Sequence, residues 1–287
     1  MNHRSFNILG TIAVVNFSEK TNAIEKKKFA NQLLKNNLQI KTVLEKSGRF
    51  KGRLRKMQTR YLAGEKNKEV LYKENNCVFR FNIDKTYFSP RLSNERKEIA
   101  SKIKKGDKVL VMFAGVAPFS IVIAKNSKAE KVFSNEINKE ANKYAKLNIE
   151  LNKVKNKVEL INGDIKKVVK KWCEKDARFS SRGEKKSPFI VSRKEREENK
   201  GFPRFDVIVM PRPRLKETFL REAFKLSKKG TRIFYYDFCK LDEEDEILEK
   251  IKTQAKSSNK KIKILQTSKA GEIAPYKMRI RIDFEIL

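Results

Sequence analysis

The chain of 287 residues has one histidine and three cysteines, and each scarcity argues against a class of chemistry. His3 stands beside the N-terminus, where it cannot support histidine acid/base catalysis or the common metal centres. Cys77, Cys173 and Cys239 are odd in number and far apart, so they form neither a disulfide framework nor a zinc site. We therefore expect no bound metal and a reducing, cytoplasmic location.

The sequence also lacks long apolar runs and has few acidic residues. No stretch of 18 apolar residues occurs, and residues 1–15 have too short an apolar core for a signal peptide, so no membrane contact is expected. Lys and Arg number 68 against 35 Asp and Glu, a formal charge of +33. A lysine-rich genome or growth at high temperature explains part of this excess. The remainder predicts a polyanionic partner, with nucleic acid as the first choice.

Two patterns of secondary structure divide the chain. Residues 5–86 contain a strand at 7–16, a helix at 23–36 capped by Thr21 or Asn22, and short alternating segments, which together predict a small α+β domain. Helices and strands alternate from residue 93 onward. We therefore expect one domain over 1–86 and a second over 87–287.

The second domain is expected to be α/β, with a mostly parallel, doubly wound sheet. The last strand alternates cleanly and is expected to pair antiparallel at or near an edge. Residues 176–204 are highly charged and predict a long mobile basic loop. The expected helices are 93–104, 118–126, 138–152, 164–174, 215–228 and 242–257, and the expected strands are 108–113, 131–135, 157–161, 205–210, 231–238, 261–267 and 277–286.

The segment VLVMFAGVAPFSI predicts a buried strand, a thin turn and a helix that begins near Pro118. Ala114, Gly115 and Ala117 keep the turn small, so a ligand can approach the backbone. A GxGxxG loop and a Walker lysine are both missing, which disfavours a dinucleotide or a nucleoside triphosphate. A smaller adenosyl ligand fits this turn better.

Two acidic residues follow the next two strands. Glu136 is placed to accept hydrogen bonds from both ribose hydroxyls, and Asp164 in the Gly-Asp pair is placed to meet the adenine amino group. Taken alone, Glu136 could equally be interpreted as a neighbour of a helix N-cap with no role in binding. Because the turn and both acids are ordered over three successive strands, the set predicts S-adenosylmethionine.

At this point the chain resembles a known family, the archaeal and eukaryotic tRNA (guanine-37-N1)-methyltransferases. The matching segments run from about residue 8 to the C-terminus: KTVLEKSGRFKGRLR, YFSPRLSNER, VLVMFAGVAPFSI, the Gly-Asp pair, MPRP, YYDF and GEIAP with RIDFEI. The resemblance implies a class I (Rossmann-like) methyltransferase domain behind the small domain. It also implies methyl transfer from S-adenosylmethionine to N1 of guanosine 37 in tRNA, by a monomer.

The resemblance assigns roles to residues in both domains. Guanine N1 carries a proton at neutral pH, so a base must remove it, and a cation must stabilise the charge that develops on O6. The family motifs place Glu95 as the base and Arg55 beside O6. The alternative for Glu95 is a surface pair on a helix, and Arg55 has Lys51, Arg53 and Lys56 as competitors for a simple phosphate contact.

The other candidate site residues fall into two groups. Arg91 and Arg96 are interpreted as phosphate contacts or as partners of Glu95. The cofactor candidates are Tyr87, Arg91, Phe113, Ala114, Gly115, Val116, Pro118, Phe119, Glu136, Ile137, Asp164 and Met210, and the substrate candidates are Arg96, Pro211, Arg212 and Pro213.

The chain departs from the family pattern at three places. Many members have Asp where this chain has Val111 and Gly where it has Ala117. The family motif Asn-Leu-Pro is replaced by Pro211-Arg212-Pro213, which removes an amide side chain expected to hold the guanine. The carbonyls of Met210 or Pro211, or the Arg212 guanidinium, are the candidate substitutes.

The N-terminus and the motifs also bear on substrate choice. The first expected strand begins at residue 7, so the module that many members use to touch the outer corner of tRNA is not expected. Selection would then rest on the anticodon arm. Three alternatives stay open: aminocarboxypropyl transfer, which SPRLSNER argues against; methylation of a wyosine-pathway intermediate at the same position; and a degenerate, non-catalytic tRNA-binding protein.

Overall fold

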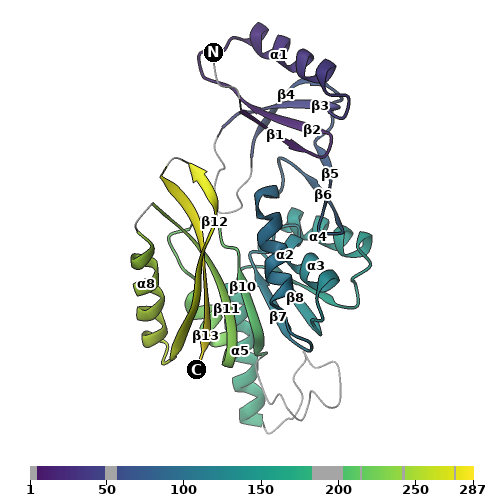
Figure 1. Cartoon of the computed structure of the whole chain (residues 1–287). Helices are drawn as coiled ribbons and strands as arrows, with labels where there is room; N and C mark the ends of the chain where they lie inside the picture. Colours follow the sequence, from purple (N-terminus) through teal and green to yellow (C-terminus); the bar gives the residue numbers. More distant parts are fainter. Residues whose placement is uncertain (1–4, 49–56, 183–202, 214, 241–242, 275) are drawn as a thin grey trace. The chain divides into compact units, whose positions relative to one another are not determined.

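The structure is a computed structural model, and it describes residues 5–48, 57–182, 203–213, 215–240, 243–274 and 276–287 (Figure 1). The chain divides into two compact units. We call Met1–Ser101, Gly115–Asn126 and Asn138–Asn156 the N-terminal unit, and Lys102–Ala114, Ser127–Ile137 and Lys157–Leu287 the sheet unit. The boundary expected at 86/87 from the sequence stays a prediction.

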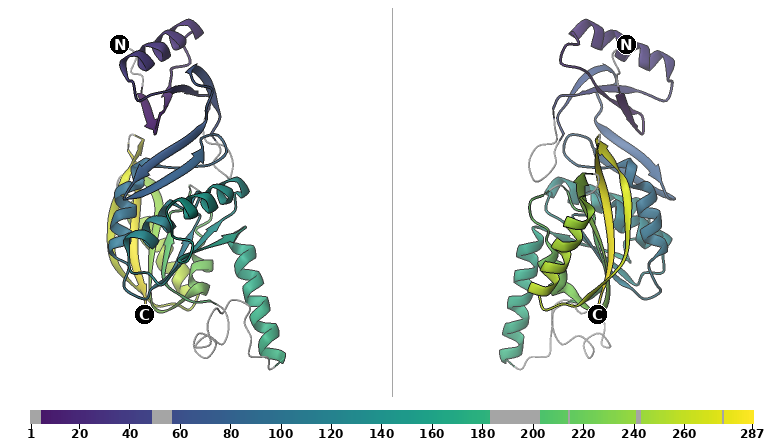
Figure 2. Two further views of the ribbon diagram at one scale, coloured as in Figure 1. Left: turned by 90° about the vertical axis from the view of Figure 1, so that its right-hand side faces the viewer. Right: turned by 60° about the vertical axis from the view of Figure 1, so that its left-hand side comes forward.

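A four-stranded sheet and one helix begin the N-terminal unit. The strands follow the order β1 (Ser5–Leu9), β2 (Ile12–Asn16), β3 (Thr42–Lys46) and β4 (Thr59–Gly64), and only the β2–β3 pair is parallel. Helix α1 (Ala23–Asn36) buries Ala30 and Leu33 against this sheet (Figure 2). The expected helix 23–36 is confirmed, and Asn22 caps it by accepting a hydrogen bond from the Glu25 amide.

The single strand expected at 7–16 is wrong, because Gly10 turns the chain between β1 and β2. Its φ of +57° favours glycine, and an added Cβ would lie 2.3 Å from the Leu71 carbonyl oxygen. A side chain at position 10 would therefore collide with the backbone at Leu71, in the same unit.

A hairpin and three helices complete the N-terminal unit. Strands β5 (Glu69–Glu74) and β6 (Cys77–Asn82) pair antiparallel. The Asn148 side chain, in helix α4, accepts a hydrogen bond from the Arg80 amide and donates one to the Arg80 carbonyl. The Asn152 side chain, at the C-cap of α4, makes the same two hydrogen bonds with Val78. These two amide side chains act as a substitute for a neighbouring strand. The other helical segments are η1 (Pro90–Leu92), α2 (Ser93–Ser101), α3 (Pro118–Asn126) and α4 (Lys139–Leu151).

The sheet unit contains a seven-stranded sheet in the order β12-β13-β11-β10-β7-β8-β9. The five strands from β11 to β9 are parallel, and β13 is antiparallel to both neighbours. The mixed α/β fold and the antiparallel last strand are thus confirmed. The strands are β7 (Lys108–Met112), β8 (Lys131–Glu136), β9 (Val158–Asn162), β10 (Phe205–Met210), β11 (Ser227–Lys240), β12 (Ile262–Ala274) and β13 (Lys277–Ile286).

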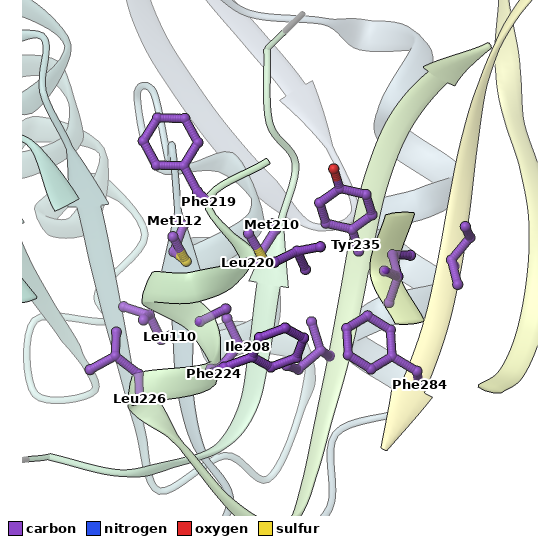
Figure 3. Close-up of a cluster of buried hydrophobic side chains, with 14 of the residues drawn as sticks. Leu110, Met112, Ile208, Met210, Phe219, Leu220, Phe224, Leu226, Tyr235 and Phe284 are labelled. Atoms are coloured by element: carbon purple, nitrogen blue, oxygen red, sulfur yellow. The ribbon is translucent and has the colours of Figure 1, made fainter. Parts of the chain in front are cut away.

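One face of this sheet packs against α5 (Ile165–Arg182), α7 (Leu220–Leu226) and α8 (Glu244–Ser257). Figure 3 shows Leu110, Ile208, Leu220 and Phe224 among the side chains of this core, which are fully buried or nearly so. Core residues alternate with residues of the opposite face along each strand, as a sheet requires. The core therefore holds β7 and β10 rigidly where their carboxyl ends emerge.

Four expectations about this unit are wrong in their extent. The strands expected at 231–238 and 261–267 extend over Ser227–Lys240 and Ile262–Ala274. Helix 215–228 is reduced to α7, because β11 already begins at Ser227 and Phe219 takes a φ of +60°. Helix α5 continues to Arg182, so residues 176–182 are helical although a loop was expected. The remainder of the expected loop that falls within 183–202 lies outside the described residues.

Within the described ranges no helix is both long and apolar enough to cross a membrane. Nor do these residues contain a cluster of three or more His, Cys, Asp or Glu side chains suited to a metal ion.

Candidate active site

The carboxyl ends of β7, β8, β9 and β10 lie along one edge of the sheet, because these four strands are parallel. Nine of the sequence-predicted site residues stand at this edge. They are Phe113 and Ala114 after β7, Glu136 and Ile137 at the end of β8, Asp164 after β9, and Met210, Pro211, Arg212 and Pro213 from β10 onward. Ligands bind outside this edge in open α/β sheets, which agrees with the expected placement.

Hydrogen bonds connect the strand ends to one another. The Ala114 amide donates to the Asn135 carbonyl, and the Gly163 amide donates to the Glu136 carbonyl, each at 2.8 Å. The buried Asn135 amide group donates to the carbonyls of Ile161 (2.9 Å) and Gly163 (3.1 Å). Sequence reasoning missed Asn135; the signal was a polar pair, Ser134-Asn135, directly after the apolar residues Val132 and Phe133.

The two acidic residues at this edge differ in their surroundings. Glu136 is half-buried at the last position of β8. Asp164 is also half-buried, and its Oδ1 accepts from the Lys166 amide at 3.0 Å, so it caps the start of α5. The ribose and adenine contacts of these carboxylates stay predictions.

The turn after β7 has an unusual backbone. Phe113, Gly115 and Ala117 have φ values of +59°, +59° and +66°, in the left-handed region. A non-glycine residue there costs on the order of 1–3 kcal/mol and is most often found at functional sites. Ala117, where the resembling family has Gly, is fully buried. The sequence departure at Ala117 therefore places a non-glycine residue at a left-handed position of this turn.

The N-terminal unit brings the two halves of its own predicted residues together. A Cβ added to Gly115 would lie 3.4 Å from the Tyr87 carbonyl, and the Arg96 guanidinium lies 5.7 Å from the Phe119 ring centre. Val116 is anchored through its carbonyl, which accepts from the Asn148 side chain at 3.1 Å. The segments 87–96 and 115–119 are thus neighbours, with Pro118 at the start of α3 as predicted.

Arg96 is the most buried cation of this segment, with 1% exposure. Its guanidinium forms a two-pronged ion pair with Glu74 of β5 and donates to the Ser89 carbonyl at 3.0 Å. It also lies 5.2 Å from the Phe88 ring centre. This geometry makes Arg96 an anchor for the start of α2, and its contact with substrate stays a prediction.

Glu95 precedes Arg96 in the first turn of α2 and is 9% exposed. Neighbouring positions on a helix point about 100° apart, so the anchored Arg96 fixes the direction of Glu95. Tyr87 is half-buried and Arg91 is exposed. The proposed partner of O6, Arg55, lies outside the described residues.

Arg212 at the end of β10 is also buried, with 3% exposure. It forms an ion pair with Asp237 of β11 and donates to the carbonyls of Leu215 (2.5 Å) and Glu217 (2.9 Å). The Arg212 amide donates to the Met210 carbonyl at 2.7 Å. The Met210 carbonyl and the Arg212 guanidinium, two of the three expected substitutes for the family amide, therefore have partners within the protein. The buried Nε of Arg212 has no hydrogen-bond partner among the described residues.

Val111 lies inside β7 and is fully buried, paired with Ser134 of β8 and Val209 of β10. Its side chain fits the apolar interior of the sheet.

The seven-stranded, mostly parallel sheet with the antiparallel β13 is the fold of a class I methyltransferase, a class that uses S-adenosylmethionine. Residues 70–192 match the TRM5/TYW2 methyltransferase domain, and residues 2–67 match the TYW2 N-terminal domain. The chain belongs to the TRM5/TYW2 methyltransferase family, as the sequence motifs predicted.

Three comparisons illustrate this relationship. A tRNA (guanine(37)-N(1))/4-demethylwyosine(37)-methyltransferase, Taw22 of Nanoarchaeum equitans, is 33% identical over 99% of this chain and 100% of its own. The tRNA (guanine(37)-N(1))-methyltransferase Trm5b of Pyrococcus abyssi is 31% identical over 98% of this chain and 74% of its own. The crystal structure of P. abyssi Trm5b superposes with a TM-score of 0.78 at 30% identity, covering 98% of this chain and 74% of that one.

Proposed function

We propose that this protein is a tRNA methyltransferase that transfers a methyl group from S-adenosylmethionine to N1 of guanosine 37. The observation that carries the proposal is the similarity to Taw22 over essentially the full length of both chains, since that relative acts on N1 of guanine 37. The net charge of +33 supports a tRNA substrate, because it favours binding to phosphates.

The half-buried carboxylate at the end of β8 and the thin turn after β7 fit an adenosyl ligand. Glu136 would accept hydrogen bonds from the ribose hydroxyls, and Asp164 would meet the adenine amino group. Gly115 would allow close approach of the ligand to the backbone. The bound cofactor supplies an electrophilic methyl group on a sulfonium centre.

Glu95 is proposed to remove the proton from guanine N1, so that the N1 lone pair becomes available to attack the methyl carbon. Burial and the neighbouring anchor of Arg96 favour this role, because a base must be held in one orientation. Arg55 is proposed to stabilise the negative charge that develops on O6.

A second candidate substrate is 4-demethylwyosine at the same tRNA position. The similar Taw22 acts on both bases, and Pro211 provides no amide side chain that would select guanine. Both reactions would use the same cofactor edge. The two candidates differ only in the accepting base.

The proposal can be tested by incubating the protein with unmodified tRNA transcripts and labelled S-adenosylmethionine, followed by mass spectrometry of the nucleosides. We expect a labelled 1-methylguanosine peak that disappears when G37 is replaced by adenosine. A tRNA carrying 4-demethylwyosine, assayed in parallel, reports the second activity. No methylation of either substrate, with intact tRNA binding, would refute the enzymatic proposal.

A truncated substrate tests how tRNA is selected. If the anticodon arm carries the recognition, a minihelix containing only that arm should be methylated nearly as well as whole tRNA. Loss of most of the activity on the minihelix would contradict this expectation. Binding should also weaken steeply as salt rises.

A further inference from the structure

The loop 211–219, of which residues 211–213 and 215–219 are described, joins the carboxyl end of β10 to α7, at the edge where the cofactor is proposed to bind. Its first residues alternate proline, arginine and proline, a composition expected on an exposed turn. Arg212 is instead 3% exposed. A buried guanidinium between two prolines needs compensation for the water that it has lost.

One guanidinium spans the loop and joins it to the neighbouring strand. Arg212 pairs with Asp237 on the neighbouring strand β11 and donates to the carbonyls of Leu215 and Glu217. The planar, forked guanidinium is suited to contacts in several directions, which an ammonium group would not reproduce. Arg212 therefore fixes the path of the loop.

Asp237 is held in turn by its own neighbours. Its Oδ2 accepts from the Tyr235 hydroxyl and its Oδ1 from the Phe238 amide, each at 2.8 Å. Burial raises the pKa of the Tyr235 hydroxyl, with the Asp237 charge contributing, so the hydroxyl stays a donor. The orientation of the Asp237 carboxylate is thus held by contacts other than the one with Arg212.

The far end of the loop contacts the turn after β7. The ring of Phe219 meets that of Phe113 edge-on, with centres 5.0 Å apart and planes at 73°. Lys166 of α5 pairs with Glu217 at 2.5 Å and lies 5.3 Å from the Phe219 ring centre. The loop is therefore held at one end by Arg212 and at the other by the turn proposed to approach the methyl donor.

We propose that the Arg212–Asp237 pair positions the accepting base, by fixing the 211–219 loop at the required distance from the methyl donor. The inference rests on the function proposed above. Pro211 and Pro213 have no polar side-chain atoms, so recognition by this part of the loop falls to backbone groups, whose direction depends on the loop path. A displacement of about 1 Å at such a position can lower a rate about 100-fold.

Two conservative variants test this role by weakening the pair from either side. Arg212→Lys keeps the charge but cannot reach both carbonyls, and Asp237→Asn keeps the shape but removes the charge. We expect kcat to fall about 100-fold in Arg212→Lys while KM for S-adenosylmethionine changes less than about threefold. Amide hydrogen exchange within 215–219 should become faster, and the double variant should be little worse than either single one.

Arg232→Lys is the matched control. Arg232 also joins a carboxylate, Asp107, to a backbone carbonyl, that of Lys102, but at the start of β7, away from the carboxyl edge. This variant should lose comparable thermal stability, yet keep its kcat and the exchange rates of the 211–219 loop.

Three outcomes would overturn the inference: kcat of Arg212→Lys within about threefold of the parent, an equal loss of kcat in Arg232→Lys, or unchanged exchange in the loop. A raised KM for tRNA with unchanged kcat would instead identify Arg212 as a direct tRNA contact. If the parent protein methylated no position-37 substrate, the proposed function would fail. The exchange experiment would still decide separately whether Arg212 holds the loop.

Discussion

Two buried arginines, one in each compact unit, occupy motifs that the sequence assigned to substrate binding. Arg96 pairs with Glu74 and lies between Phe88 and Phe119, and it anchors a regular helix. Arg212 pairs with Asp237 and holds the carbonyls of an irregular loop.

The two arginines differ in the element that each one holds, a regular helix for Arg96 and an irregular loop for Arg212. Helix α2 keeps its own hydrogen bonds without Arg96, so the loss should appear mainly as reduced stability. In the described part of the 211–219 loop (211–213 and 215–219), Arg212 donates hydrogen bonds to two carbonyls, so its loss should appear mainly as reduced activity. Both arginines are thus expected to act through contacts within the protein.

The largest effect is expected for Glu74→Ala. This change leaves the 1%-exposed Arg96 as a buried, unpaired charge and should lower the free energy of unfolding by about 3–5 kcal/mol. Urea denaturation would measure it, with Glu69→Ala on the same strand, whose carboxylate is about one-third exposed, as the control. A loss of less than about 1 kcal/mol in Glu74→Ala would show that Arg96 does not anchor the unit.

The next largest effect is expected for Glu95, the proposed base beside the anchoring Arg96. Glu95→Gln preserves size and should reduce methyl transfer by about 100-fold or more, with little change in tRNA or cofactor binding. Single-turnover assays and equilibrium binding would show this split. Glu98→Gln, the same change three residues later on α2, should have normal turnover; unchanged turnover in Glu95→Gln would remove Glu95 from the base role.

A smaller effect tests how firmly Asp237 is held. Tyr235→Phe removes the 2.8 Å hydrogen bond to Asp237 and should cost about 1 kcal/mol of stability. If the carboxylate orients Arg212, kcat should fall together with faster exchange in the 211–219 loop. A stability loss with unchanged kcat would limit the positioning role to the ion pair itself.

The smallest effect is expected for an exposed ion pair that serves as the baseline. Lys143 and Glu140 lie 2.7 Å apart on α4, and the Lys143 side chain is 72% exposed. Lys143→Ala should change the free energy of unfolding by less than about 0.5 kcal/mol, because water and salt screen the pair. A thermal melt at low and high salt would check this; a loss near that of Glu74→Ala would remove the contrast between buried and exposed pairs.

Local sequence was sufficient to determine the alternation of helices and strands, the buried strand β7 with its thin turn, and the acidic residues that follow β8 and β9. These features depend on side-chain periodicity and on backbone preferences within a few residues. Helix α1 was predicted at its observed bounds for the same reason. The family resemblance added the reaction and the roles of Glu95 and Arg55.

Only the tertiary structure decided which charged residues are used within the protein. Arg96 meets Glu74 across 22 positions, Arg212 meets Asp237 on a neighbouring strand, and Asn135 joins two strand ends. None of these partners is close enough in sequence for periodicity to reveal it. The same holds for the shortened helix at 215–228: the carbonyls of Leu215 and Glu217 accept hydrogen bonds from Arg212, and β11 already begins at Ser227. Burial and long-range pairing are properties of the folded chain, and they determine whether a basic motif residue faces the substrate or holds the site together.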